Sequence, residues 1–406
     1  MQHHTITRQT IGTLKSFYDL MAQTRHVRLA TVNGLFSTQG IQKIQTDALK
    51  NALSSLEECL EDEYNAFLKI DDSENIEVDL TYEVTELKKD IYYLENGEDK
   101  FMSYLESLHP NFLSHVQSGT TILKGKHFNC FITDRDGTIN NYCGRYRSSV
   151  QSIYNAVFLT RFARNTVSNP ILITSAPLKD TGIMDLSVNP EKTIIYAASK
   201  GREFVDLTGT RKSFPIDDQK QQLINRLYQK LNDLVKDPAY EKFSLIGSGL
   251  QLKFGQITIA RQDINGSVPE AKSEAFLALI KTIVKELDPL KENFRIEDTG
   301  LDIEIILTIP DEKTGLKDFD KADAIKYLDK ELNLNMGKGP HLICGDTGSD
   351  VPMLEATMAR TNDTWSIFVT RKPELVDRVK TICPNAVIVP EPDILVTILN
   401  QLSINS

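Results

Sequence analysis

The sequence predicts an α/β protein whose core is a doubly wound, Rossmann-like parallel sheet, with an inserted α+β domain and a mostly helical N-terminal region. Three observations support this fold class. Residues 1–122 show mainly helical spacing of apolar side chains. From Gly125 onward, short apolar runs alternate with helical stretches, which is typical of a parallel sheet covered by helices. Residues 214–310 interrupt this alternation, so the core is predicted to comprise residues 123–213 and 311–406.

The composition is that of an ordinary globular protein. The chain has 406 residues, 40% hydrophobic and 25% charged, which suits two or three domains. No apolar run approaches the length of a membrane span, and the polar start Met1–His4 has no signal-peptide core. We therefore expect a cytoplasmic location and no membrane partner. The net charge of −10 argues against nucleic-acid binding. Five scattered cysteines indicate a reducing compartment, without disulfides or a zinc site.

The N-terminal region carries little recognisable chemistry. Helical spacing extends over Ile6–Gln23, Ile41–Lys69 and Glu86–Leu108, and Val78–Tyr82 alternates like a short strand. Residues 51–100 contain 16 Asp and Glu against 4 Lys, so this part is strongly acidic. We expect the acidic face to be solvated, or to contact a protein partner or a second copy of the chain.

Short apolar runs mark the strands of the core. They cover Phe128–Ile132, Ile171–Thr174, Thr193–Ala198, Leu342–Cys344, Ile367–Val369 and Ala386–Val389. Between the first two runs, and again at the end of the chain, apolar residues recur at helical spacing, which predicts a helix in each place. Sheets of this kind bind ligands beyond the C-terminal ends of their strands, so the functional residues are expected there.

The inserted domain begins near Pro215. Leucines recur on one helical face from Leu223 to Leu234, short strands follow, and a second helical stretch covers Ala275–Leu287 before further strands. Helices and strands without strict alternation indicate an α+β unit. The linkers near Ser213–Pro215 and Ile309–Asp311 are expected to act as hinges.

The stretch Asp134–Thr138 has the clearest chemical pattern. It reads Asp-Arg-Asp-Gly-Thr and follows the first core strand. Two carboxylates at i and i+2 lie on one side of an extended chain, and Gly137 permits a sharp turn. The pair suits a nucleophile, a proton donor and part of a Mg²⁺ site. The alternatives are a plain Asp-Gly turn and the metal-binding Asp-x-Asp of a sugar transferase, whereas a calcium loop would need Glu where Arg145 stands.

Three further segments follow in order along the chain. Ser175 ends a strand with a hydroxyl group that can hold a phosphate oxygen, and Thr174 competes for this role. Lys321 opens a helix, where anions are favoured, with Lys317 as the alternative. Gly345–Asp350 is a second acidic loop at the end of another short apolar run.

In this order, the four segments resemble the motif set of the haloacid-dehalogenase-like phosphatases, over roughly Lys126–Leu402. The resemblance implies that Asp134 attacks phosphorus to give an aspartyl-phosphate, and that Asp136 acts first as acid and then as base. It also implies that residues 214–310 form the cap of a sugar phosphatase. The implied Mg²⁺ ligands are Asp134, the Asp136 backbone carbonyl and Asp346, with Asp350 orienting waters or Lys321, while Ser175 and Lys321 neutralise the phosphate charge.

Two stretches bear on the substrate. Lys200–Glu203 and Leu207–Thr210 resemble the segment before the cap in trehalose-6-phosphate phosphatases. The cap motif of that family, Lys-x-x-Ser-x-x-x-His-Tyr-Arg, is broken in this chain. Arg261 matches the final Arg, but Ile259-Ala260 replaces His-Tyr and Gly255 replaces Ser. A relative acting on another glycoside phosphate is therefore expected.

Together with the acidic N-terminal region, Asp134–Tyr146 most resembles glucosylglycerol-phosphate phosphatases. This implies hydrolysis of glucosylglycerol 3-phosphate to glucosylglycerol, a compatible solute made under osmotic stress, with trehalose 6-phosphate or sucrose phosphate as alternative substrates. A regulatory or scaffold protein on the same fold is the alternative of another class, and the intact motif residues weigh against it. The candidate substrate contacts are Lys253, Arg261, Asp302, Glu304 and Glu203, and for those in the cap an internal salt bridge is the competing role.

Overall fold

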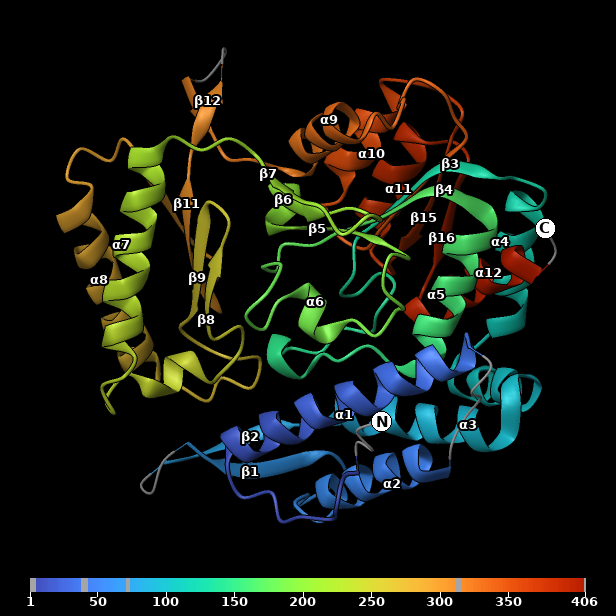
Figure 1. The fold of residues 1–406 in the computed structure, drawn as a ribbon. Coiled ribbons are helices and arrows are strands. Elements are labelled where there is room, and N and C mark those ends of the chain that lie inside the picture. The colour runs from blue at the N-terminus through green and yellow to red at the C-terminus, as the bar shows by residue number, and fades with distance from the viewer. Residues whose placement is uncertain (1–4, 38–42, 71–73, 312–314, 405–406) are drawn as a thin grey trace.

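The computed structural model describes residues 5–37, 43–70, 74–311 and 315–404. Figure 1 shows three parts, with the N-terminal region at the bottom, the core at the right and the cap at the left. Within the described residues, no helix combines the length and the apolar character needed to cross a lipid bilayer.

The core is a mixed sheet of eight strands with helices on both faces, which confirms the predicted α/β class. The strand order is β16-β15-β14-β3-β4-β5-β6-β7. The pairs β5-β6 and β6-β7 are antiparallel, and the other pairs are parallel. Successive side chains of a strand point to opposite faces. Phe131 therefore packs in the cluster containing α5 and α12, whereas Ile132 packs in the cluster containing α9, α10 and α11.

The elements of the core are listed here in chain order. They are β3 (Phe128–Thr133), α5 (Ile153–Thr166), β4 (Val167–Ile173), α6 (Ile183–Leu186), β5 (Ile195–Ala198), β6 (Glu203–Val205), β7 (Arg211–Ser213), α9 (Lys321–Leu332), β14 (His341–Gly345), α10 (Val351–Met358), β15 (Thr364–Val369), α11 (Pro373–Ile382), β16 (Ala386–Val389) and α12 (Pro392–Ile404).

The described part of the N-terminal region contains four helices and one pair of antiparallel strands. Its elements are α1 (Leu14–Leu35), α2 (Lys43–Glu57), β1 (Asn65–Lys69), β2 (Asn75–Asp79), α3 (Thr81–Leu108) and α4 (Phe112–Leu123). The helix predicted over Ile41–Lys69 was wrong at its C-terminal end, because β1 pairs with β2 there and alternates buried Ala66 and Leu68 with exposed Phe67. Residues 41 and 42 of that prediction lie outside the described residues. The first helix starts at Leu14, where Thr13 and Ser16 form a capping box.

The cap is a four-stranded antiparallel sheet with two helices on the side away from the core (Figure 1). Its elements are α7 (Asp218–Leu234), β8 (Leu250–Lys253), β9 (Gln256–Ala260), α8 (Glu270–Leu287), β10 (Phe294–Asp298) and β11 (Asp302–Leu307), followed by the hairpin β12 (Ile309–Asp311) and β13 (Gly315–Lys317). The apolar face of α7 packs Leu227 and Leu231 against this sheet.

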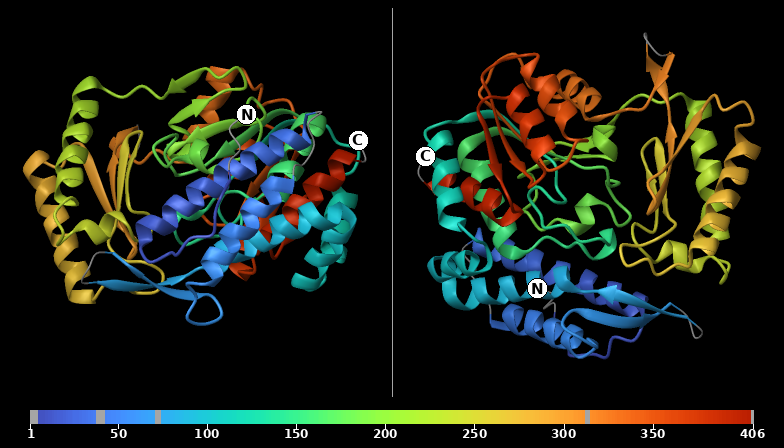
Figure 2. Two further views of the ribbon diagram at one scale, coloured as in Figure 1. Left: turned by 60° about the horizontal axis from the view of Figure 1, so that its bottom comes forward. Right: turned by 180° about the vertical axis from the view of Figure 1, so that it is seen from behind.

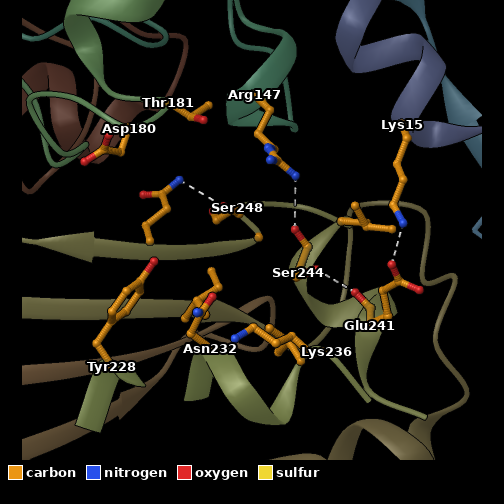
Figure 3. Close-up of a pocket in the computed structure, with 15 residues that line it drawn as sticks. Lys15, Arg147, Asp180, Thr181, Tyr228, Asn232, Lys236, Glu241, Ser244 and Ser248 are labelled. Carbon is orange, nitrogen blue, oxygen red and sulfur yellow. Dashed lines mark hydrogen bonds and ion pairs between the residues drawn. The ribbon is translucent and has the colours of Figure 1, made fainter. Parts of the chain in front are cut away.

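The N-terminal region also reaches the cap, as the lower and rear views of Figure 2 show. Lys15 Nζ lies 2.5 Å from Glu241 Oε1, and the Tyr18 hydroxyl donates to the Leu245 carbonyl at 2.6 Å. Arg147 of the core donates to the Ser244 carbonyl at 3.5 Å. A polar cavity of about 510 Å³ lies at this junction (Figure 3). The cap is therefore attached to α1 as well as to the core.

Candidate active site

The acidic loops come together because their strands are neighbours. Strand β3 lies between β14 and β4, and all three are parallel. Asp134 directly follows β3, Thr174 and Ser175 follow β4, and Asp346 follows β14. The Asp134 amide donates to the Cys344 carbonyl at 3.1 Å, which joins the Asp134 loop to the strand end that precedes Asp346. This edge is the C-terminal one, where such sheets bind ligands.

Gly137 allows the nucleophile loop to turn beside the second acidic loop. Its φ of +85° is a left-handed conformation that side chains disfavour, and a Cβ atom here would collide with the Asp346 carboxylate. The Gly137 amide donates to the Asn140 carbonyl at 2.8 Å, closing the turn. Thr138 Oγ1 then donates to Asp346 Oδ1 at 3.0 Å. Glycine at 137 is thus required by both the turn and the close approach.

Lys321 begins α9, and its ammonium group contacts two carboxylates. Nζ lies 2.6 Å from Asp134 Oδ1 and also contacts Asp350 Oδ1. Asp320 caps the helix by accepting from the amides of residues 322 and 323, which fixes the position of the lysine. The alternative, Lys317, pairs with Asp323 at 2.7 Å instead. The structure thus brings Lys321 to the predicted nucleophile.

Asp134, Asp346 and Asp350 form a cluster in which one carboxylate oxygen from each lies within 4.8 Å of the others. Burial raises the pKa of Asp134 to about 7, although Lys321 opposes the shift. Burial, Asp134 and Asp350 together raise the pKa of Asp346 to about 8. Burial acts in the same direction on Asp350, but Lys321 and two backbone amides prevail and lower its pKa.

The cluster fits a hard divalent cation. Carboxylate oxygens are ligands that Mg²⁺ prefers, and a bound cation would favour the ionised form of each of the three carboxyls because opposite charge lowers a carboxyl pKa. The carboxylate of Asp136 is not part of the cluster. It accepts from Arg135 at 2.5 Å, and Arg135 is itself held by Ser149. The Asp136 carboxylate is therefore paired with Arg135 and stands apart from the group of three carboxylates.

A cavity of about 540 Å³ contains these groups and opens between the core and the cap. Asp136, Thr174 and Ser175 line it together with the carboxylate cluster and Lys321. Thr174 is almost fully buried, and its hydroxyl accepts from the Ala176 amide at 3.2 Å. Both of the hydroxyl candidates thus face the cavity, with Thr174 already engaged in the turn.

The structure brings some predicted substrate contacts to this cavity and not others. Glu304 lines it, and its carboxylate lies 3.7 Å from Lys200 Nζ. Lys253 is buried in β8, where burial lowers its pKa and Glu304 and Asp302 oppose that shift. Asp302 accepts from Ser248 at 2.9 Å, and burial raises its pKa. Neither Lys253 nor Asp302 is among the residues that line the cavity.

Arg261 and Glu203 are directed elsewhere. Arg261 forms ion pairs with Asp298 and Glu274, both at 2.8 Å. Glu203 accepts from Ser199 at 3.0 Å and from Arg211 at 2.6 Å. Neither residue lines the cavity, because internal ion pairs hold both side chains.

The cavity lining also includes side chains that were not among the candidates from the sequence. They include Tyr142, Lys200, Glu297, Asp318, Phe319 and Pro352. Tyr142 lies in the segment after the nucleophile loop and is largely exposed. Lys200 has φ of +60°, a strained conformation that marks functional positions. The proximity of Tyr142 to Asp136 in the sequence is the one signal that could have identified it.

Comparison with known proteins gives the family. The model described as "Trehalose-6-phosphate phosphatase, C-terminal" matches residues 131–395, and the "Trehalose-6-phosphate phosphatase N-terminal helical bundle domain" matches residues 13–112. The trehalose-phosphatase of Brugia malayi is 27% identical over 443 residues, covering 99% of this chain and 88% of its own.

Two other similarities cover only part of one of the two chains compared. Alpha,alpha-trehalose-phosphate synthase (UDP-forming) 2 of Aphelenchoides avenae is 32% identical over 427 residues, covering 99% of this chain. The match covers 32% of that synthase, so the chain spans about a third of its length. A structure of Aspergillus fumigatus trehalose-6-phosphate phosphatase aligns with a TM-score of 0.40 at 15% identity, covering 72% of this chain and 97% of its own. From the two family models, the chain belongs to the trehalose-6-phosphate phosphatase family.

Proposed function

We propose that this chain is a Mg²⁺-dependent sugar phosphatase that works through an aspartyl-phosphate on Asp134. The observation that carries the proposal is the 2.6 Å contact between Lys321 and Asp134, at a cavity that also holds Asp346 and Asp350. A cation, a nucleophilic carboxylate and a metal-ligand set in one cavity are what phosphoryl transfer requires.

The first step transfers the phosphoryl group to the protein. A carboxylate oxygen of Asp134 forms a bond to phosphorus, while the bond from phosphorus to the sugar oxygen breaks. Asp136 gives its proton to that oxygen, so the sugar leaves as an alcohol. Lys321 and the hydroxyls of Thr174 and Ser175 stabilise the charge on the other phosphate oxygens.

The second step regenerates the protein. A water molecule attacks the phosphorus of the aspartyl-phosphate, and the Asp136 carboxylate takes the proton of that water. The bond from phosphorus to Asp134 breaks, and inorganic phosphate leaves. Both carboxyl groups then have their starting protonation states, so the cycle needs only the phosphate ester and water.

Asp134, Asp346 and Asp350 are the residues that would hold Mg²⁺, with the Asp136 backbone carbonyl as the further ligand proposed from the motif. When bound, the ion supplies positive charge that offsets the charge of the phosphoryl group. The contacts of Asp350 with Lys321 and with two backbone amides give it a second role, which is to orient the lysine.

We propose trehalose 6-phosphate as the first substrate to test, because both family models and the Brugia malayi relative support it. The broken cap motif favours another glycoside phosphate, and the resemblance of Asp134–Tyr146 makes glucosylglycerol 3-phosphate the second candidate. Ile259 and Ala260 are fully buried in β9, and Gly255 lies in the β8–β9 turn, where a side chain would collide with Arg202. These departures lie outside the cavity lining, so they do not argue strongly against the first substrate.

The test measures phosphate release from trehalose 6-phosphate, glucosylglycerol 3-phosphate and sucrose phosphate side by side, with and without Mg²⁺. We expect the highest kcat/KM with trehalose 6-phosphate. Asp134→Asn should abolish release, while Asp377→Asn, on the exposed face of α11, should match wild type. A wild type as inert as Asp134→Asn on all three esters would contradict the hydrolytic function and leave the scaffold alternative.

A further inference from the structure

We propose that α3 of the N-terminal region positions the loop that carries Asp136, with Tyr82 and Glu86 as positioning residues for the reaction. This inference rests on the proposed function. It assigns to the N-terminal region a part in the active site, although none of its side chains lines the catalytic cavity among the residues described.

Asn140 is the connection between α3 and Asp136. Its carbonyl accepts from the Gly137 amide at 2.8 Å, and its amide donates to the Arg135 carbonyl at 2.9 Å. Asp136 and Asn140 also form an isolated β-bridge. The backbone on both sides of Asp136 is thus tied to Asn140, so a displacement of Asn140 would move the proposed proton donor.

Tyr82 of α3 forms a hydrogen bond with the Asn140 side chain. The Tyr82 side chain is 8% exposed, and its hydroxyl oxygen accepts from Asn140 Nδ2 at 3.0 Å. The same hydroxyl donates to the Val150 carbonyl at 2.9 Å, at the far end of the loop. One side chain of α3 thus links the start and the end of the segment between the nucleophile and α5.

Glu86 holds the next residue of the loop. Its Oε1 accepts from Asn141 Nδ2 at 3.0 Å, and Asp393 of α12 accepts from the same amide group at 2.8 Å. Lys89 lies between the two carboxylates, 2.8 Å from Glu86 and 2.7 Å from Asp393, and offsets their charge. Asn141 is therefore clamped between the N-terminal region and the core, directly before the cavity residue Tyr142.

These residues share one face of α3, because side chains four apart on a helix are neighbours. Tyr82, Glu86 and Asp90 follow at this spacing, and Asp90 accepts from the Ile153 amide at 2.6 Å. Glu86 and Asp90 are almost fully buried. Burying polar groups is costly unless each is bonded, and here the bonds are made mainly to the loop from Asn140 to Ile153. The face therefore serves to hold this loop.

A displaced proton donor affects some esters more than others. A sugar leaves as a strongly basic alkoxide unless Asp136 protonates it, whereas p-nitrophenolate leaves without that proton. kcat/KM reports the steps up to the first phosphoryl transfer. Loss of positioning should therefore lower kcat/KM for a sugar phosphate and leave kcat/KM for p-nitrophenyl phosphate nearly unchanged. A general loss of folded protein would lower both equally.

The experiment compares Tyr82→Phe, Glu86→Ala and Glu86→Gln in the full chain on trehalose 6-phosphate and p-nitrophenyl phosphate. The matched control is Tyr104→Phe, which removes a hydroxyl from α3 where the ring stacks on Tyr92 at 4.4 Å. We expect Tyr82→Phe and Glu86→Ala to lose about tenfold in kcat/KM on the sugar phosphate and less than about twofold on the aryl ester. Glu86→Gln keeps the Oε1 acceptor and should recover most of the loss.

Two outcomes would overturn the inference. Wild-type values for Tyr82→Phe and Glu86→Ala on both esters would show that the loop needs no support from α3. An equal loss on both esters, without recovery in Glu86→Gln, would show a role in folding only. Failure of the proposed function is distinguishable, since Asp134→Asn would then match wild type on p-nitrophenyl phosphate.

Discussion

Replacing Arg28 by methionine tests how firmly the N-terminal region is joined to the core. Arg28 of α1 and Asp90 of α3 are both fully buried, and Nε lies 2.6 Å from Oδ2. Arg28 also donates to the Val150 carbonyl at 3.3 Å. Removing one partner of a buried ion pair costs about 3–5 kcal/mol of unfolding free energy, because the remaining charge is left without compensation. We expect Arg28→Met to approach this cost at pH 8.

The cost should depend on pH in a defined direction. Burial raises the pKa of Asp90 to about 6, with Arg28 opposing the shift and Glu86 adding to it. Since the folded pKa lies above the unfolded one, the folded state binds more protons, and stability falls as pH rises from about 4 to about 6. Without Arg28 the folded pKa rises further, so the mutant continues to lose stability above pH 6. The cost of Arg28→Met should then grow by about 1.4 kcal/mol per pH unit until the new pKa is reached.

Urea unfolding followed by circular dichroism at pH 5, 6, 7 and 8 measures this cost. The control is Arg28→Met made in the Asp90→Asn variant. The asparagine at position 90 keeps an acceptor for the Ile153 amide, but it cannot titrate. In that background the cost of Arg28→Met should not change with pH. A cost that is equal at pH 5 and pH 8 in the otherwise wild-type chain would refute the assignment of Asp90 as the titrating partner.

Three further predictions concern the candidate active site. Lys321→Met should lower kcat by about 10² or more, because it removes the cation beside the nucleophile. The control Lys317→Met should keep kcat within about threefold of wild type. Steady-state kinetics of the two variants measures the difference. Adding Mg²⁺ should raise the melting temperature of wild type but not of Asp346→Asn, because a ligand that binds the folded state stabilises it. Thermal unfolding with Mg²⁺ and with EDTA, which removes the ion, measures the difference. Gly137→Ala should lose most of the phosphatase activity and about 1–3 kcal/mol of unfolding free energy, since the left-handed turn and the Asp346 contact both exclude a side chain. Phosphate release measures the activity, and urea unfolding measures the stability.

The local features of this protein follow from the order of its residues. Each acidic loop follows a short apolar strand within a few residues, so chain connectivity alone places its carboxylates at a strand end. The alternation of strands and helices then implied one parallel sheet, and such a sheet collects its strand ends at one edge. The fold class and the grouping of Asp134, Ser175 and Asp346 were predictable for this reason.

The contacts between distant segments depend on how the elements pack in three dimensions. Lys321 lies 187 positions from Asp134, and its choice over Lys317 depends on how α9 packs against the sheet. Arg261 had the right chemistry for a substrate contact, but partners brought in by other cap elements engage it. The hydrogen bonds from α3 to the loop after the nucleophile have no sequence signature. In the sequence, Glu86 lies in an acidic segment and cannot be distinguished from a solvated charge, although it is buried in the fold. Packing across the fold, which no local pattern encodes, decides which charges face water and which face each other.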